Sequence, residues 1–355
     1  MDQKEKQDIR NLTRDNLVEF FTGHGEKSFR ANQVYDWLWK KDVGAFTEMT
    51  NLSQELRTFL DSYFFINKLV VADKQISADK TIKSAFKLMD GKVVEGVLIP
   101  TSKRMTACIS SQVGCSLSCK FCATGSLKRM RNLEPAEIYD QVVSIKKQAK
   151  EHYDQNLSNI VMMGMGEPLL NYKNVMEGIR MITAEEGLGM SPKRITLSTA
   201  GISKMIHQLG DDEVKFNLAL SLHAANDVKR NEIMPINESN SLSELSDSLK
   251  YFHDKTGTRV TYEYIIFRDF NDELTDAAEL AVFCKHVPCK VNIIEYNPID
   301  NGQFQQASRT NVDAFALYLE ERNIIVNVRR SRGKDIDAAC GQLANKNETA
   351  INKDQ

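Results

Sequence analysis

The sequence predicts an α/β protein in which a small N-terminal α+β region precedes a full or partial (β/α) barrel. From Arg104 onward, short runs rich in β-branched residues alternate with amphipathic stretches of helical period. Six or seven such units follow one another, which favours a barrel over an open doubly wound sheet. The chain has 355 residues, enough for one large domain and a smaller one.

The first 100 residues are expected to form helices and then a β-hairpin. Apolar residues recur on one face of a helix in two stretches, at Val34, Trp37 and Leu38, and at Leu52, Leu56, Phe59 and Leu60. From about residue 65 the pattern becomes strand-like. Asp90-Gly91 separates two such runs, "SAFKLM" and "KVVEGVLIP", and this dipeptide is a strong hairpin signal.

The barrel region is expected to span residues 101–343. Its strand candidates are "RMTACIS", "NIVMMGM", "RITLST", "FNLALSL", "VTYEYIIF", "CKVNIIEYN" and "IIVNVRR". One helix is expected to start at Pro135, a favoured first helical residue, and others to cover about 172–184, 242–254, 274–286 and 311–322. Chemistry in such barrels lies at the C-terminal ends of the strands. Residues 344–355 read as a polar tail.

Composition narrows the class of protein. With 42% hydrophobic and 26% charged residues, no transmembrane-length apolar run and no signal-like N-terminus, the chain is expected to be cytoplasmic and to have no membrane partner. A net charge of -2 argues against a broadly basic nucleic-acid surface, so RNA contacts would come from local patches. The candidates are "LKRMRN", with Lys128, Arg129 and Arg131, and "VRRSRGK" (328–334).

Three cysteines stand close together at the end of the first barrel strand. Cys115, Cys119 and Cys122 have the spacing C-x3-C-x2-C. Structural zinc and fully ligated iron–sulfur clusters both take four protein ligands. Three thiolates on a four-iron cube leave one iron open to a substrate. The alternative is a zinc site completed by Cys108 or a histidine.

This spacing resembles that of the radical S-adenosylmethionine (SAM) enzymes. The resemblance implies a partial radical SAM barrel and one [4Fe–4S] cluster held by Cys115, Cys119 and Cys122. It also implies that SAM binds the open iron and is cleaved there by one electron from the cluster, so an external electron donor is needed.

Polar residues at the ends of later strands form the expected SAM-binding shell. In "MMGMGEPLL", Gly164 and Gly166 would let the backbone approach a ligand, and Glu167 would bind the SAM ammonium group. The remaining candidates are Ser198, Ser221, Leu222, His223 and Asn297. Taken singly, such residues are more often turns, caps or, for His223, a satisfied structural histidine.

The motifs taken together are similar to those of the RlmN/Cfr family of RNA methyltransferases. They are "CISSQVGCSLSCKFCATG", "MGMGEPL", "SLHAAND", "MPIN" and "IDAACGQL", with further similarity in the helical N-terminal region. By this resemblance Cys340 is methylated, Cys108 resolves a covalent RNA adduct, and Glu95 is the general base. From the residues alone, Glu95 could equally be the polar face of an edge strand. Cys284 and Cys289 are read as small buried hydrophobes.

The resemblance implies methylation of C2 of an adenosine in the peptidyl transferase centre of 23S rRNA, and of a tRNA adenosine next to the anticodon. Arg329, Arg330 and Arg332 are expected to lower the pKa of Cys340. A Cys108–Cys340 disulfide would need an external reductant after each turnover. The alternatives are Cfr-type methylation at C8, which "GEPL" disfavours, and a non-catalytic RNA-binding protein with a structural metal.

Overall fold

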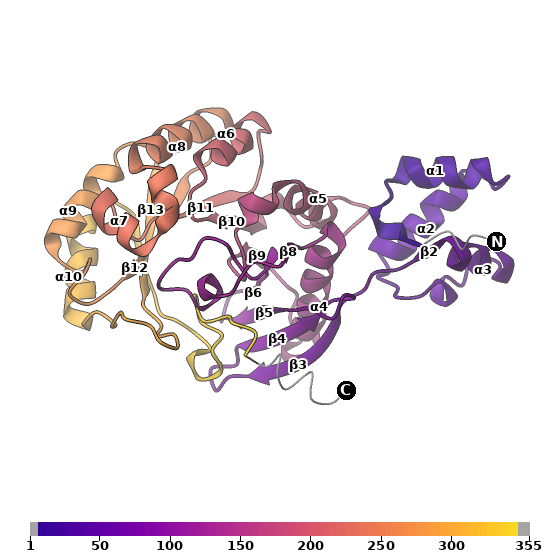
Figure 1. Ribbon diagram of the computed structural model, residues 1–355, viewed down its shortest axis with the longest axis horizontal. Coiled ribbons are helices and arrows are strands. Elements are labelled where there is room, and N and C mark those ends of the chain that lie inside the picture. Colours follow the sequence, from indigo (N-terminus) through magenta and orange to yellow (C-terminus); the bar gives the residue numbers. More distant parts are fainter. Residues whose placement is uncertain (1–5, 347–355) are drawn as a thin grey trace.

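The structure is a computed structural model, and it describes residues 6–346. Its centre is a ten-stranded sheet in the order β14-β13-β12-β11-β10-β9-β6-β5-β4-β3 (Figure 1). All neighbours from β6 to β14 run parallel, and every one of these strands lies within a predicted strand. The bounds are β6 Met105–Cys108, β9 Asn159–Met162, β10 Ile195–Thr199, β11 Asn217–Ser221, β12 Val260–Ile266, β13 Cys289–Glu295 and β14 Val326–Arg329.

The predicted partial barrel is confirmed. Strands β14 and β3 end the sheet order and do not pair with each other, so the parallel strands curve without closing. The helices that connect them are α4 Pro135–Tyr153, α5 Tyr172–Thr183, α6 Ser203–Asp211, α7 Asp227–Ile233, α8 Leu242–Thr256, α9 Leu274–Phe283 and α10 Arg309–Glu320. The sequence patterns predicted five of the seven. They missed α6 and α7, which are too short for apolar periodicity to stand out.

The sheet continues across the expected domain boundary at residue 100. Strands β3 (Val70–Ile76), β4 (Ile82–Lys87) and β5 (Val93–Pro100) form the predicted antiparallel hairpin and its neighbour. Strand β5 then pairs antiparallel with β6, with Val97 opposite Cys108. The hairpin therefore belongs to the barrel sheet, because backbone hydrogen bonds join β5 to the strand that starts the barrel.

A separate helical lobe is left at the N-terminus, comprising α1 (Arg14–Gly23), α2 (Phe29–Trp39) and α3 (Gln54–Tyr63) (Figure 1). It is held to the barrel through α4. Arg10 donates to both carboxylate oxygens of Asp140, at 2.7 and 3.0 Å, and both side chains are buried. The Tyr139 hydroxyl donates to the backbone carbonyl of Trp39. A buried bidentate pair fixes orientation more than it adds stability, so the lobe has a defined pose.

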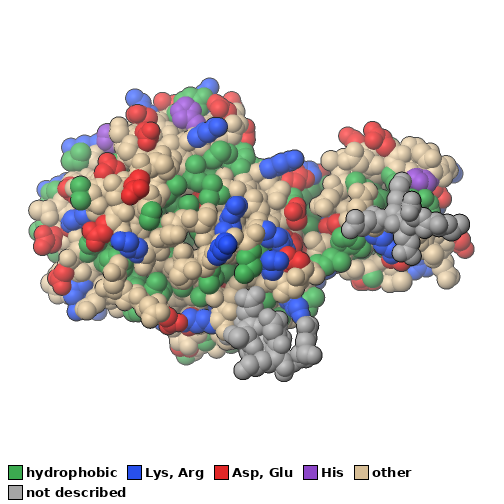
Figure 2. Space-filling model, in the orientation of Figure 1, with side chains coloured by type: hydrophobic (Ala, Val, Ile, Leu, Met, Phe, Trp, Pro, Cys, Tyr) green, Lys and Arg blue, Asp and Glu red, His purple; other side chains and the backbone are tan. Residues whose placement is uncertain are grey.

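Lys and Arg side chains gather near the middle of the face shown in Figure 2, between the barrel and the N-terminal lobe. Arg131 belongs to the predicted patch at 127–132, but it is committed to structural ion pairs. It donates to both oxygens of Glu137, at 2.7 and 2.8 Å, and to Asp90 at 2.7 Å. Lys128 and Arg129 are exposed. Within residues 6–346, no helix combines the length and apolar character that crossing a bilayer requires.

Candidate active site

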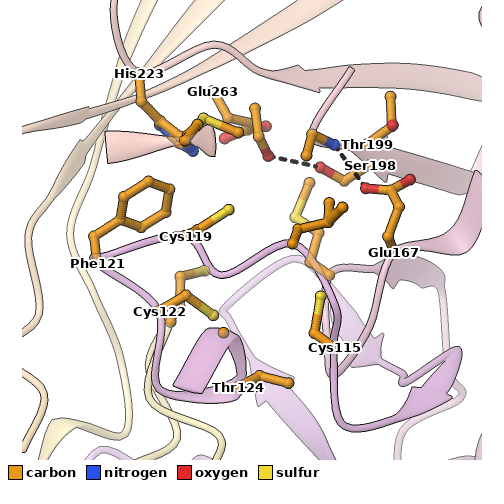
Figure 3. A pocket seen from close by; sticks show the side chains of 18 of the residues that line it. Cys115, Cys119, Phe121, Cys122, Thr124, Glu167, Ser198, Thr199, His223 and Glu263 are labelled. Carbon is orange, nitrogen blue, oxygen red and sulfur yellow. Dashed lines mark hydrogen bonds between the residues drawn. The ribbon is translucent and has the colours of Figure 1, made fainter. Parts of the chain in front are cut away.

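The three-cysteine motif lies in the loop that follows β6, at the C-terminal end of the parallel strands. The loop folds back on itself, with the amide of Cys115 donating to Leu127 at 3.3 Å and that of Cys122 to Cys119 at 3.2 Å. Gly114 permits this fold, because its φ is +75° and a Cβ there would lie 2.3 Å from the Lys128 carbonyl oxygen. The loop thus presents Cys115, Cys119 and Cys122 to one cavity (Figure 3).

This cavity, called here the cysteine cavity, spans about 860 Å³ of space not filled by atoms, part of it open to solvent. Side chains from the ends of successive strands form its wall opposite the loop. They include Glu167 after β9, Ser198 on β10, Ser221 on β11, Glu263 on β12 and Ile294 on β13. Most of the predicted cofactor shell therefore converges on the three thiols, as expected for the C-terminal face of a barrel.

Glu167 is a buried carboxylate with a fixed orientation. One oxygen accepts from the amide of Leu169 at 3.0 Å and the other from the amide of Ala200 at 2.8 Å. Burial raises the pKa of this carboxyl, and the two amide hydrogen bonds partly offset the effect. A carboxylate has about four acceptor positions, so acceptor capacity remains for a cationic group in the cavity.

Gly164 and Gly166 serve chain packing. A Cβ on Gly164 would lie 2.7 Å from the backbone of Ile109, and one on Gly166, where φ is +94°, would lie 2.5 Å from Gln112. These contacts are with the segment after β6. The glycines therefore allow the β9 turn to lie against that segment, and both also line the cysteine cavity.

His223 is neutral and buried. Burial, assisted by nearby Arg230, lowers its pKa to about 3. Its Nδ1 accepts from the amide of Ile265 at 3.0 Å, which assigns the ring proton to Nε2. The ring packs edge-on against Phe121, with 4.7 Å between ring centroids (Figure 3). His223 thus has one ring nitrogen bonded to the backbone, and its side chain lines the cavity.

The remaining candidates for the SAM-binding shell fall into two groups, those that line the cavity and those that do not. The hydroxyl oxygens of Ser198 and Ser221 lie 3.5 Å apart, and both residues line the cavity. Leu222 is fully buried and does not line the cavity. Asn297 does not line the cavity either. Asn297 instead donates from Nδ2 to the backbone carbonyl of Cys340 at 3.2 Å, while its buried Oδ1 has no partner.

The donor set is three thiols on one loop, one ligand short of a closed zinc site. Tetrahedral zinc with bonds of about 2.3 Å needs sulfurs about 3.8 Å apart. In the part of the chain that the structure describes, no three His, Cys, Asp or Glu side chains converge tightly enough for such a site. Burial raises the pKa of Cys115 to about 11 and also raises those of Cys119 and Cys122, so a bound metal centre must supply the charge that keeps them thiolates.

Removing one cysteine of the loop is expected to abolish cluster binding. Cys119→Ala leaves two thiols, so iron and sulfide after anaerobic reconstitution should fall to background and the brown visible absorption should vanish. The matched control is Cys284→Ala, which removes a buried thiol at the end of α9. Full iron content in Cys119→Ala, or zinc in place of iron in the unaltered protein, would contradict the cluster assignment.

Cys340 lies at the boundary between the cysteine cavity and a second cavity. The second cavity, called here the arginine cavity, is lined by Cys108 as well as Cys340. Besides Cys122, which belongs to the cluster motif, Cys340 is the one thiol of residues 6–346 that borders both spaces. The sequence motif alone could not show this shared position.

A tight turn holds Cys340 in place. Gly341 has φ +84°, and its carbonyl accepts from the amide of Ala123, within the cysteine loop, at 2.7 Å. The predicted lowering of the Cys340 pKa is wrong. Burial raises that pKa, and the opposing effect of the Arg329 guanidinium is weaker. Burial likewise raises the pKa of Cys108 to about 12, with the neighbouring Cys340 adding to the rise.

Glu95 lies on the same sheet face as Cys108, because Cys108 pairs with Val97 and residues two apart in a strand face the same side. The edge-strand alternative fails, since β5 is an interior strand and Glu95 is buried. Its carboxylate is enclosed by the C-terminal segment. It accepts from the amides of Ala344 at 2.9 Å and Asn345 at 3.1 Å, and Lys83 lies 3.5 Å away.

Two buried charged residues of the site were not predicted. Glu263 lines the cysteine cavity, accepts from Asn292 at 2.8 Å and pairs with Arg329 at 3.2 Å. Arg230 is fully buried and donates to the backbone carbonyls of Leu222 and Ala200, which ties the ends of β10 and β11 together. The available signal for Glu263 was a lone acidic residue inside the apolar run "VTYEYIIF".

Comparison with known proteins identifies the family. Residues 7–66 match the ribosomal RNA large subunit methyltransferase N-terminal domain, and residues 109–281 match the radical SAM superfamily. A "Probable dual-specificity RNA methyltransferase RlmN" from Cytophaga hutchinsonii is 62% identical over 96% of this chain and 93% of that protein. A "Dual-specificity RNA methyltransferase RlmN" from Pelobacter propionicus is 42% identical over 98% of each.

A solved structure agrees with this result. The crystal structure of a radical SAM methyltransferase from Sphaerobacter thermophilus superimposes with a TM-score of 0.89 at 37% identity, covering 95% of this chain and 99% of that one. The sequence relatives and the solved structure therefore indicate the same family over nearly the whole length of this chain. The chain belongs to the RlmN family of radical SAM RNA methyltransferases.

Proposed function

We propose that this protein methylates C2 of an adenosine in the peptidyl transferase centre of 23S rRNA, and of an adenosine next to the anticodon of a tRNA, by carrying the methyl group on Cys340. The observation that carries the proposal is the position of Cys340 between the cysteine cavity and the cavity that contains Cys108. The name "dual-specificity" of the relatives supports two kinds of RNA substrate.

The residues of the cysteine cavity suit a [4Fe–4S] cluster on Cys115, Cys119 and Cys122 with SAM beside it. When bound, these groups supply a one-electron cleavage of SAM that permits removal of a hydrogen atom, with the electron coming from an external donor. Glu167 offers a fixed carboxylate for an ammonium group. Ser198 and Ser221 offer hydroxyls, and neutral His223 with Phe121 offers an uncharged wall.

Cys340 would act as the methyl carrier. Adenine C2 is not nucleophilic, so direct displacement on a SAM methyl fails, whereas a thiolate accepts a methyl group readily. Held at the boundary, a methyl group on Cys340 can lose a hydrogen atom on the cofactor side and form its new carbon–carbon bond on the other side. Because burial keeps the thiol protonated, the first methyl transfer must be accompanied by loss of that proton.

Glu95 would remove the C2 proton from the adenine as general base, and the unpaired electron left by carbon–carbon bond formation would pass to a one-electron acceptor, so that the aromatic ring is restored. In the structure its carboxylate is capped by the amides of Ala344 and Asn345. The adenine must therefore displace these amides to reach Glu95. The same segment carries Cys340, so entry of the base and movement of the methyl carrier are mechanically linked.

Cys108 would release the product. Its thiolate attacks the sulfur of Cys340, so a sulfur–sulfur bond forms and the bond from that sulfur to the methylene carbon breaks. The carbon takes the electron pair and a proton and becomes the methyl group. The resulting disulfide then accepts two electrons and two protons from an external reductant.

The proposal predicts a specific isotope pattern. Protein reconstituted without oxygen is given a reductant, unmodified rRNA or tRNA, and SAM with a fully deuterated methyl group. Nucleoside mass spectrometry should show 2-methyladenosine with two deuteriums, and 5′-deoxyadenosine with the third. Three retained deuteriums would contradict the Cys340 route. An 8-methyladenosine product would overturn the C2 assignment while preserving that route.

A further inference from the structure

The wall of the arginine cavity carries an excess of positive charge close to the two thiols. Four arginines line it, and no Asp or Glu does. The four are Arg104, just before β6, and Arg329, Arg330 and Arg332, in and after β14. Elements far apart in the sequence thus place guanidinium groups around one space.

Two of these arginines have partners and two do not. Arg329 pairs with Glu263 at 3.2 Å, and Arg332 donates to the backbone carbonyl of Asp79 at 3.2 Å. The side chains of Arg104 and Arg330 are exposed and make no hydrogen bond or ion pair with any residue in 6–346. Two exposed, unpaired guanidinium groups that line one cavity are available for a ligand.

Two acidic residues share a second cavity with Arg330 and pair with other residues. A small neighbouring cavity is lined by Arg330 together with Glu295 and Asp313. Glu295 pairs with Lys334 at 3.2 Å, and Asp313 pairs with Arg309 at 3.8 Å. The charge of Arg330 is therefore not cancelled by a direct partner.

We infer that the arginine cavity binds the phosphodiester groups of the RNA on either side of the target nucleotide, with Arg104 and Arg330 as the phosphate contacts. Arginine matches phosphate oxygens with two parallel hydrogen bonds and holds its charge at every physiological pH. Phosphate contacts position a nucleic acid without reading its sequence. Cys108 lies buried in the same cavity, so a flipped base directed inward would meet the thiols.

This inference rests on the proposed function in one respect, that RNA is the substrate whose base reaches Cys340 and Cys108. It adds where the backbone of that RNA is held. The predicted basic patch at 127–132 is a weaker candidate, since Arg131 there is committed to Glu137 and Asp90.

The test compares the double variant Arg104→Ala/Arg330→Ala with the unaltered protein. Affinity for an unmodified rRNA fragment and for an unmodified tRNA transcript is measured at several salt concentrations. Loss of two contacts to single-stranded RNA should weaken binding and flatten the slope of log K against log salt by about 1.4, which is twice about 0.7 per contact. KM for RNA should rise at least ~10-fold, and kcat should stay within about twofold.

The matched control is Arg194→Ala. Arg194 is exposed, lies just before β10 and outside the lining of the arginine cavity, and makes no side-chain hydrogen bond or ion pair within the described residues. It should leave affinity and slope unchanged. A second variant, Arg104→Lys/Arg330→Lys, should restore the salt slope but only part of the affinity, because lysine keeps the charge without the two-pronged geometry.

Methyl loading of Cys340 from SAM without RNA separates this inference from the proposed function. Loading should be normal in Arg104→Ala/Arg330→Ala. A loss of loading with unchanged RNA affinity would mean that the arginines bind a SAM carboxylate, and would overturn the inference. Unchanged affinity and slope would also overturn it. Salt-dependent binding through both arginines, without any methylated product from the unaltered protein, would instead reject the proposed function alone.

Discussion

Replacing Cys340 with alanine is expected to eliminate both methyl incorporation into the protein and methylated adenosine in RNA. Cys340 is the one thiol outside the cluster motif that borders both cavities within the described residues, and it is therefore the proposed methyl carrier. Protein incubated with methyl-labelled SAM, then digested and examined by mass spectrometry, should show no methylated cysteine. RNA product should fall below detection.

The cluster should survive this substitution. The turn at Cys340 meets the cysteine loop through a backbone bond, Ala123 amide to Gly341 carbonyl, which alanine at 340 does not remove. Iron content equal to that of the unaltered protein therefore separates loss of the carrier from loss of the cofactor. Cys289→Ala, outside both cavities, is the control and should label normally. Product from Cys340→Ala at more than about 1% of the normal rate would refute the carrier role.

Much of the architecture was predictable because the spacing of apolar residues within a short stretch of sequence indicates a strand or a helix. All seven parallel strands and the long helices follow from runs of β-branched residues and from apolar residues at helical spacing. Local patterns could not predict that the hairpin before residue 100 joins the barrel sheet. Whether β5 pairs onward with β6 depends on long-range register, Val97 opposite Cys108, which no local pattern encodes.

In the candidate site, too, some features were predictable from the sequence and others were not. Residues that end strands, such as Ser198 and Ser221, could be placed from topology alone, because parallel strands end at one face. Asn297 also ends a strand, yet it turns to the backbone of Cys340. The sign of the Cys340 pKa shift depended on burial outweighing Arg329, which needs three-dimensional contacts. The cap on Glu95 joins residues 249 positions apart, beyond any sequence pattern.

That cap places Glu95 against the segment that also carries Cys340. Thr124, in the cysteine loop, donates to the Leu343 carbonyl at 2.6 Å, and the next two amides reach Glu95. Residues 340–345 thus run from the edge of the cysteine cavity to Glu95. In the structure Cys340 borders the cysteine cavity and Glu95 is buried under the two amides, so on the proposed mechanism methyl loading and entry of the adenine would use different positions of this one segment.

Replacing Cys108 with alanine is expected to stop the reaction one step later and trap RNA on the protein. On the proposed mechanism, methyl loading and bond formation to adenine use Cys340 and removal of the C2 proton uses Glu95, and this change leaves both residues in place. Only the attack on the Cys340 sulfur is lost, because Cys108 is the other thiol of the arginine cavity outside the cluster motif. A slow-migrating protein–RNA band should appear on a denaturing gel, resist reductant, and disappear on nuclease treatment.

The double variant Cys108→Ala/Cys340→Ala tests whether the RNA in this band is attached through the sulfur of Cys340. Without Cys340 there is no sulfur to hold the RNA, so the band should vanish, whereas Cys108→Ala/Cys284→Ala should retain it. Peptide mapping should place the RNA mass on the segment that contains Cys340. Because Cys108 is buried and alanine is smaller by one sulfur atom, a stability loss of about 1 kcal/mol is expected, which leaves the fold intact for the assay. Normal turnover by Cys108→Ala with no band would show that another group, or solvent, resolves the adduct.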